Sequence, residues 1–254
     1  MKFASGMRVA ALLLASLLVA TIPAHARDKS DKKEKPSAAQ TVDSGSFGIF
    51  VRGQRVATET FNIQQQNGAS SIKSQFKETG GNDTAAQKSD LQITSAGALV
   101  HYDWSQSVGG SLTVVPNNDF LLERITPPSA GKAAEQPFLM PSTSSILDNN
   151  FFIHREVLAW RYLAANCKSD PAGLKCDHTP GDFGVLVPQD RASLHVRMEL
   201  VGKEKVTIRG TERELLRLNL TGDNLAWALW VDDHDQFKLL RVAIAADNTE
   251  VVRD

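Results

Sequence analysis

The sequence Asp232-Asp233-His234-Asp235 places three carboxylates and an imidazole on consecutive residues. Carboxylates and imidazoles bind divalent metals, and a histidine beside an acid can act as a general base. A calcium loop needs oxygen ligands at alternating positions followed by glycine, but Phe237 and Lys238 occupy the next places. The segment also lies between two apolar runs, 225–231 and 237–245, which are typical of paired strands. We therefore interpret it as the polar turn of a β-hairpin and predict no metal site there.

The remaining histidines give no stronger catalytic signal. His154 falls on the apolar side of a predicted helix, where an imidazole can be a general base or a ligand but is more often part of the core. His101 and His195 fall in predicted strands without an acid at a useful spacing. The familiar serine-hydrolase, phosphate-loop, zinc-protease and dinucleotide motifs are absent from the sequence. We predict no enzyme activity and no cofactor; a hydrolase or metal enzyme that uses His154 or residues 232–235 is the least favoured alternative.

Aromatic side chains form the candidate ligand-binding set. A curved sheet and a helix can enclose an apolar cavity, and aromatic residues commonly line such sites. Trp227 and Trp230 fall on opposite faces of one predicted strand, so only one of them can face a cavity. The alternative is that these residues fill a packed core. The candidates are Tyr102, Trp104, Phe151, His154, Trp160, Trp227 and Trp230.

The elements that would position these residues are mostly strands. The pattern has a period of two from Ser46 onward, with Phe47, Ile49 and Val51 on one strand face, and Asn67-Gly68 is typical of a two-residue hairpin turn. Short strands joined by short polar turns indicate antiparallel pairing. We predict a long loop for the Pro-rich segment 126–141.

One helix is predicted, at about residues 146–165. Ser145 and Asp148 have the spacing of a capping box, and apolar residues follow at helical intervals. These residues are Phe151, Leu158 and Tyr162 in one row, and Ile153, Val157, Trp160 and Ala164 in the next. The predicted fold class is therefore mainly β (α+β), with one large curved antiparallel sheet or partly open barrel and a single amphipathic helix packed on it.

The N-terminal segment has the features of an export signal. Residues 1–26 contain two basic residues, an apolar core and the ending Ala24-His25-Ala26, which predict a secretory signal peptide cleaved after Ala26. No later stretch is apolar enough to cross a membrane. Residues 27–44 are predicted to be a disordered charged leader, because the stretch RDKSDKKEKPSAAQ has no aromatic or branched aliphatic side chain. Residues 45–254 are predicted to be one β-rich domain.

Charge and cysteine content narrow the functional classes further. Signal removal takes away two of the 28 Lys and Arg residues and leaves 29 Asp and Glu. A nucleic-acid partner is therefore not expected, since such proteins neutralise several phosphates. Cys167 and Cys176 are the only two cysteines and flank a Pro-Gly loop, which predicts a disulfide in an exported protein. A metal site that uses both cysteines and His178 is a weaker alternative.

Two stretches carry a resemblance to known families. GSFGIFVRGQRVATETF at residues 45–61 is similar to the opening of uncharacterised exported bacterial β-domains, and WVDDHDQFKLLR at 230–241 resembles their closing hairpin. The pattern also resembles the half-barrel of the LolA/LolB lipoprotein carriers, in which a curved sheet with helical cover shelters acyl chains. This resemblance implies a periplasmic or secreted bacterial protein that holds an apolar or amphipathic ligand, such as a lipid. The alternative is a structural or protein-interaction domain with a filled core.

Overall fold

The computed structural model describes residues 38–80, 86–129, 131–170 and 173–254. The predicted signal peptide and most of the predicted leader lie outside these ranges. The chain divides into Met1–Lys35 and Pro36–Asp254, and the description below concerns the second unit. Within the described ranges, the helical segment is neither long nor apolar enough to span a membrane.

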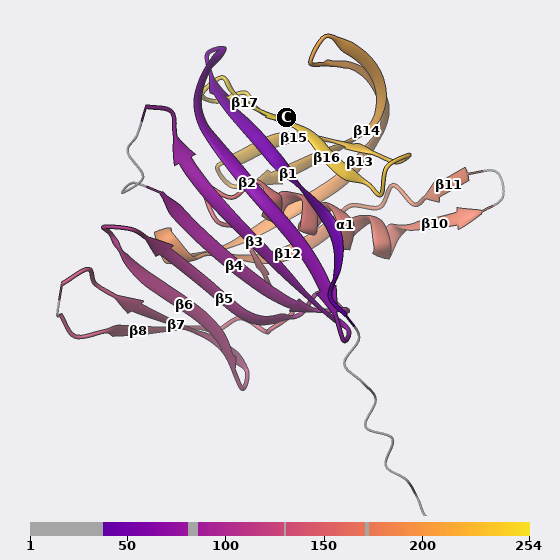
Figure 1. The fold of residues 1–254 in the computed structure, drawn as a ribbon. Coiled ribbons are helices and arrows are strands. Elements are labelled where there is room, and N and C mark those ends of the chain that lie inside the picture. Colours follow the sequence, from indigo (N-terminus) through magenta and orange to yellow (C-terminus); the bar gives the residue numbers. More distant parts are fainter. Residues whose placement is uncertain (1–37, 81–85, 130, 171–172) are drawn as a thin grey trace, which may run out of the picture. The chain divides into compact units, whose positions relative to one another are not determined.

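Strands dominate the described residues of this unit (Figure 1). Fifteen of the described strands form one sheet. They are β1 (Gln40–Val51), β2 (Gln54–Gln66), β3 (Ala69–Glu78), β4 (Gln87–Thr94), β5 (Leu99–Gln106), β6 (Gly110–Asn117), β7 (Phe120–Thr126), β8 (Ala134–Phe138), β9 (Ser145–Ile146), β12 (Gly181–Val187), β13 (Ala192–Ile208), β14 (Thr211–Gly222), β15 (Leu225–Asp232), β16 (Lys238–Ile244) and β17 (Thr249–Arg253). Their order in the sheet is β8-β7-β6-β5-β4-β3-β2-β1-β17-β16-β15-β14-β13-β12-β9. The first and last strands are therefore neighbours near the middle of the sheet.

The pairing follows from short hairpins between consecutive strands. At Asn67 and Gly68 the φ angles are 51° and 75°, the left-handed backbone that a two-residue hairpin turn of this kind requires. This confirms the turn predicted from the Asn-Gly pair. Neighbouring strands are antiparallel throughout the sheet except β9 and β12, which run parallel. The predicted fold class is confirmed: mainly β, with one large sheet that is not closed and, in the described part of the chain, a single α-helix.

Helix α1 (Ile153–Asn166) contacts strands that lie far apart in the sheet order. The ring of His154 meets that of Tyr102 on β5, and the hydroxyl oxygen of Tyr162 accepts the backbone N–H of Leu200 on β13. Nine strand spacings separate β5 from β13, which is about 43 Å in a flat sheet. A helix is only about 10 Å wide. The sheet must therefore curve around α1.

The space between the curved sheet and α1 is filled by side chains. Phe151, Ile153, Leu158 and Tyr162 of the helix region are at most 1% exposed, and the strands contribute equally buried residues. A small pocket beside His154 measures about 10 Å³, which is about the space of one water molecule. The interior beneath the helix is thus packed.

The helix begins later than the sequence predicts. Ser145–Ile146 forms β9, and the carboxylate of Asp148 accepts the N–H of Asn150 and the hydroxyl of Tyr102 instead of capping a helix. The capping-box prediction was wrong. The N-cap residue of α1 is Phe152, and its side chain makes no capping hydrogen bond. The carboxylate of Glu59 on β2 accepts the first backbone N–H groups instead.

Two other boundaries also differ from prediction. β1 begins at Gln40, inside the segment 27–44 predicted to be disordered, because these residues pair with the end of β2 and Asp43 binds Arg253 of β17. The predicted loop 126–141 contains β8, an edge strand that pairs with β7 and whose proline is tolerated at the edge.

The predicted disulfide joins Cys167 to Cys176 and closes the separate hairpin β10 (Cys167–Asp170) and β11 (Gly173–Cys176) directly after α1.

Candidate functional site

A buried carboxylate from the sheet holds the N-terminal end of α1. Glu59 is 0% exposed; its Oε2 accepts the N–H of Phe152 at 2.6 Å, and its Oε1 accepts the N–H of Ile153 at 3.3 Å and the hydroxyl of Ser74 at 2.6 Å. Burial raises the pKa of Glu59 to about 7, although these hydrogen bonds and the nearby Arg155 lower it. This contact fixes where the helix starts.

A second buried group lies beside it. The hydroxyl of Tyr102 and the amide of Gln189 donate to the carboxylate of Asp148, and the guanidinium of Arg155 donates to the carbonyl oxygens of Asp148 and Phe151. Burial raises the pKa of Asp148, although those donors oppose the rise, and burial together with the Asp148 charge raises the pKa of Tyr102. All of these side chains except Gln189 are at most 1% exposed. They hold the segment before α1 and cannot contact a substrate in this conformation.

His154 belongs to the same buried region. Burial and the neighbouring Arg155 lower the pKa of His154 to about 3, so its ring is neutral. Its Nδ1 accepts the backbone N–H of Asp148 at 3.4 Å, and the ring packs against Tyr102 and Phe151. The sequence offered a general base or a core histidine at this position; the structure places the ring in the core.

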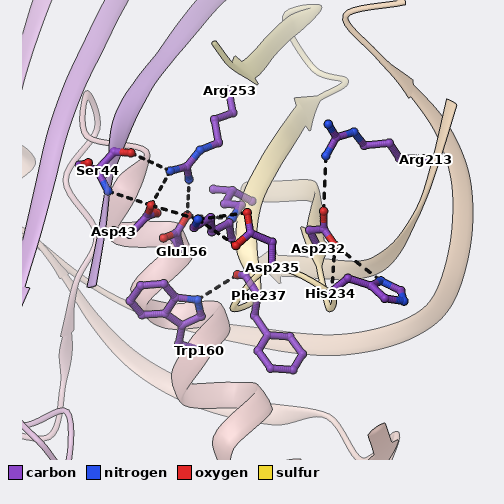
Figure 2. Close-up of polar contacts among 12 residues, drawn as sticks. Asp43, Ser44, Glu156, Trp160, Arg213, Asp232, His234, Asp235, Phe237 and Arg253 are labelled. Atoms are coloured by element: carbon purple, nitrogen blue, oxygen red, sulfur yellow. Dashed lines mark hydrogen bonds and ion pairs between the residues drawn. The ribbon is translucent and has the colours of Figure 1, made fainter. Parts of the chain in front are cut away.

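Residues 232–235 lead into the turn that the sequence predicts, and α1 contacts the backbone just after them (Figure 2). Glu156 Oε2 accepts the backbone N–H of Leu239 at 2.7 Å, and Trp160 Nε1 donates to the carbonyl oxygen of Phe237 at 2.9 Å. Gln236 and Phe237 have φ angles of 54° and 56°, which is unusual for residues with a Cβ. The two helix side chains lie one turn apart and together stabilise this backbone.

The acidic side chains of the turn already have cationic partners. Asp232, Asp233 and His234 offer ligand atoms within 4.8 Å of one another, which is a spacing that a metal could use. However, Lys203 lies 2.9 Å from Asp233 and Arg213 lies 3.5 Å from Asp232. These cations form ion pairs with the two carboxylates, and His234 lies 3.0 Å from Asp233, so the cluster is a network of ion pairs.

A groove beside the C-terminal half of α1 is the candidate for ligand binding next to the helix. It has a volume of about 560 Å³, within the range of small-molecule sites. Its apolar wall is formed by Ile93, Val157, Trp160, Ala164, Ala165 and Phe183, and its polar rim by Gln65, Ser70, Thr94, Ser95 and Arg161. We call this the α1 groove. Trp160 is thus a predicted candidate that lines this groove, whereas Trp227 and Trp230 are among the residues that line another hollow, of about 590 Å³.

Arg161 gives the α1 groove its charge. The half-buried guanidinium donates to Ser145 Oγ and, at 2.9 Å, to the carbonyl oxygen of Thr143, and it lies over the ring of Phe183. Among the described residues, no carboxylate lies within ion-pair distance of it. Burial lowers the pKa of Arg161, because its charge is partly desolvated without an opposite charge to compensate it. Arg161 and Phe183 also line a separate hollow of about 440 Å³.

Gly97, in the turn between β4 and β5, leaves room for this arginine. Its φ is 77°, and a Cβ at this position would lie 3.0 Å from both Cδ and Nε of Arg161. A glycine is therefore required by the backbone and by the approach of the side chain. Neither Gly97 nor Arg161 was predicted as a site residue, since an arginine on a helix usually indicates a solvent-exposed face.

The structure separates the remaining predicted candidates. Tyr102 and Phe151 are 0% exposed and belong to the core. Trp104 is partly buried and donates to the side chain of Gln87. Trp227 packs inward against Phe152 and Arg155, whereas Trp230 lies on the opposite face of β15 with Arg217 and Arg241. The two tryptophans thus face opposite sides, as the alternation on this strand predicts.

Comparison of the chain with protein-family models, with curated proteins and with solved structures finds no match. The site is therefore defined by its own geometry: an apolar groove with Arg161 at its edge, a partly desolvated cation that has no carboxylate partner among the described residues.

Proposed function

We propose that the protein is an exported, non-catalytic binding protein whose α1 groove holds an amphipathic ligand with an anionic head. The observation that carries the proposal is Arg161. A partly desolvated guanidinium without a carboxylate partner gains from binding an anion, and its planar donors suit a carboxylate or phosphate. A lipid-like tail along the apolar wall would bury the exposed parts of Trp160 and Ile93.

Export is part of the same proposal. The signal-like residues 1–26 support it, and so does the disulfide Cys167–Cys176, because disulfides persist mainly in oxidising compartments. We place the protein in the bacterial periplasm or outside the cell.

The binding proposal is tested with a fluorescent fatty acid and two substitutions. Arg161→Gln removes the charge and should weaken binding by about tenfold or more, as expected for a charge-assisted hydrogen bond. Ala164→Trp fills the groove from an exposed helix position and should abolish binding. Arg124→Gln and Ala245→Trp make the same changes at exposed positions away from the groove and should bind normally. Failure of the wild type to bind any such probe, or equal binding by all four variants, would refute the proposal.

The packed interior beneath α1 favours a second candidate, a structural or protein-interaction domain. This alternative requires no bound small molecule and a protein partner. Native mass spectrometry of protein purified from its own host separates the two: a lipid adduct supports ligand binding, and a ligand-free protein that co-purifies with a partner supports the alternative.

A further inference from the structure

A buried carboxyl pair joins the first strand, the last strand and the helix of this unit (Figure 2). Asp43 of β1 is 4% exposed and Glu156 of α1 is 0% exposed. Arg253 of β17 lies between them, with Nη2 2.6 Å from Asp43 Oδ1 and Nη1 3.4 Å from Glu156 Oε2. Three elements that are distant in the sequence thus meet at one guanidinium.

Each carboxyl group has one oxygen that these contacts leave unsatisfied. Asp43 Oδ1 accepts the N–H of Ser44 and Glu156 Oε2 accepts that of Leu239, whereas Asp43 Oδ2 and Glu156 Oε1 are buried without a donor among the described residues. Two ionised carboxylates could not satisfy these oxygens. One proton held between them would satisfy both, since a protonated carboxyl donates to its neighbour.

The surrounding charges are too few for two anions. Arg253 is the closest cation; its guanidinium lies over the rings of Phe47 and Phe61, and its side chain is only 11% exposed. Lys238 is the next, 4.0 Å from Asp43, but it is paired with Asp235 at 2.9 Å. Burial and the neighbouring Asp43 raise the pKa of Glu156 well above that of an ordinary glutamate, in agreement with one retained proton.

We propose that Asp43 and Glu156 share one proton, and that this proton is a pH-sensitive latch that holds the start of β1 and the β15–β16 turn on helix α1. Loss of the proton leaves two anions against one arginine in a buried site, so the contact opens. The N–H of Leu239 then loses its acceptor, and the N-terminal end of β1 loses its contact with β17. Trp160 is hydrogen-bonded to the same turn and lines the α1 groove, so opening of the turn also loosens this wall of the groove. The effect on the groove is the one consequence that rests on the proposed function.

Amide hydrogen exchange tests the latch without any ligand. Exchange at Leu239 is followed from about pH 5 to about pH 10, corrected for the intrinsic rate, because the raised pKa of Glu156 places its titration above that of ordinary carboxyl groups. We expect protection of Leu239 to fall by about tenfold or more as the pH rises in the wild type. Glu156→Gln keeps the shape and supplies a permanent donor toward Asp43, so its protection should be independent of pH.

Two further variants make the outcome decisive. Asp43→Asn also replaces the shared proton with a permanent donor, and it should give the same pH-independent protection even if Glu156→Gln fails to fold. Glu199→Gln changes an exposed acid on β13 and should behave like the wild type. A flat wild-type profile, or loss of protection in Glu156→Gln and Asp43→Asn at the same pH as in the wild type, would overturn the latch.

Discussion

Trp160 donates its indole N–H to the carbonyl oxygen of Phe237 at 2.9 Å, and Phe237 is held in a left-handed backbone conformation. One tryptophan therefore has two functions: its ring lines the α1 groove, and its polar edge holds the hairpin turn that follows β15. Residues 232–235 are polar because a hairpin turn is exposed to solvent. The backbone conformation of this turn depends on the helix side chains that contact it.

Replacement of Trp160 by phenylalanine tests this contact. Trp160→Phe keeps an aromatic ring in the groove but leaves the carbonyl oxygen of Phe237 without its donor, which should cost about 1–3 kcal/mol of unfolding free energy. Urea unfolding measures the change. Trp104→Phe is the matched control: its acceptor, Gln87, also accepts from Asn150, so the loss should be under about 1 kcal/mol. Equal losses in both variants would contradict a special role for the Trp160 contact.

Alanine at Gly97 should disturb both stability and the groove. Gly97→Ala places a Cβ against Arg161 and forces a residue with a Cβ into φ 77°. Gly53→Ala provides the comparison, because Gly53 has the same φ and its added Cβ would meet no atom within 4 Å. Both variants should lose about 1 kcal/mol from the backbone. Only Gly97→Ala should also weaken fatty-acid binding, and normal binding by that variant would argue against the position assigned to Arg161.

Glu59 makes stability depend on pH. Its pKa is raised from 4.5 to about 7 in the fold, so the folded state holds the proton more tightly than the unfolded chain. The stability that this proton contributes is complete below about pH 4.5 and is lost as the pH rises toward about 7, with a total of roughly 3 kcal/mol.

Urea unfolding at several pH values checks this slope. Glu59→Gln removes the titrating group, so its free energy of unfolding should fall less than that of the wild type between these pH values. Glu123, whose pKa burial also raises to about 7, contributes a slope of the same sign and is unchanged in this variant. Parallel pH profiles for the wild type and Glu59→Gln would show that Glu59 does not titrate in this range.

Most of the strands were predictable from the sequence because each of them carries its own pattern; β8, in a predicted loop, and β9, at a predicted helix cap, were not. Phe47 and Ile49 follow a period of two and are both buried, and Asn67-Gly68 specifies its turn locally. The body of α1 was predictable for the same reason, since Leu158 and Tyr162 repeat at helical spacing. These signals are local, and the sheet was correctly predicted from them.

The start of the helix and the site were less predictable, because long-range contacts decide them. Glu59 caps α1 from a strand 93 residues away, which overrides the local capping box at Ser145. Arg161 becomes a candidate anion site only when the turn at Gly97 and the ring of Phe183 surround it. Gly97, Arg161 and Phe183 are far apart in the sequence, so no motif or residue spacing predicts that they meet.

The most direct test of the central claim is the affinity of wild type and Arg161→Gln for a fatty acid and for the uncharged alcohol of the same chain length. This comparison isolates the pairing of the carboxylate with Arg161 from burial of the tail. We predict that the wild type binds the acid about tenfold or more tightly than the alcohol, and that this preference disappears in Arg161→Gln. An equal preference for the acid in both proteins, or no binding of either compound to the wild type, would contradict the account.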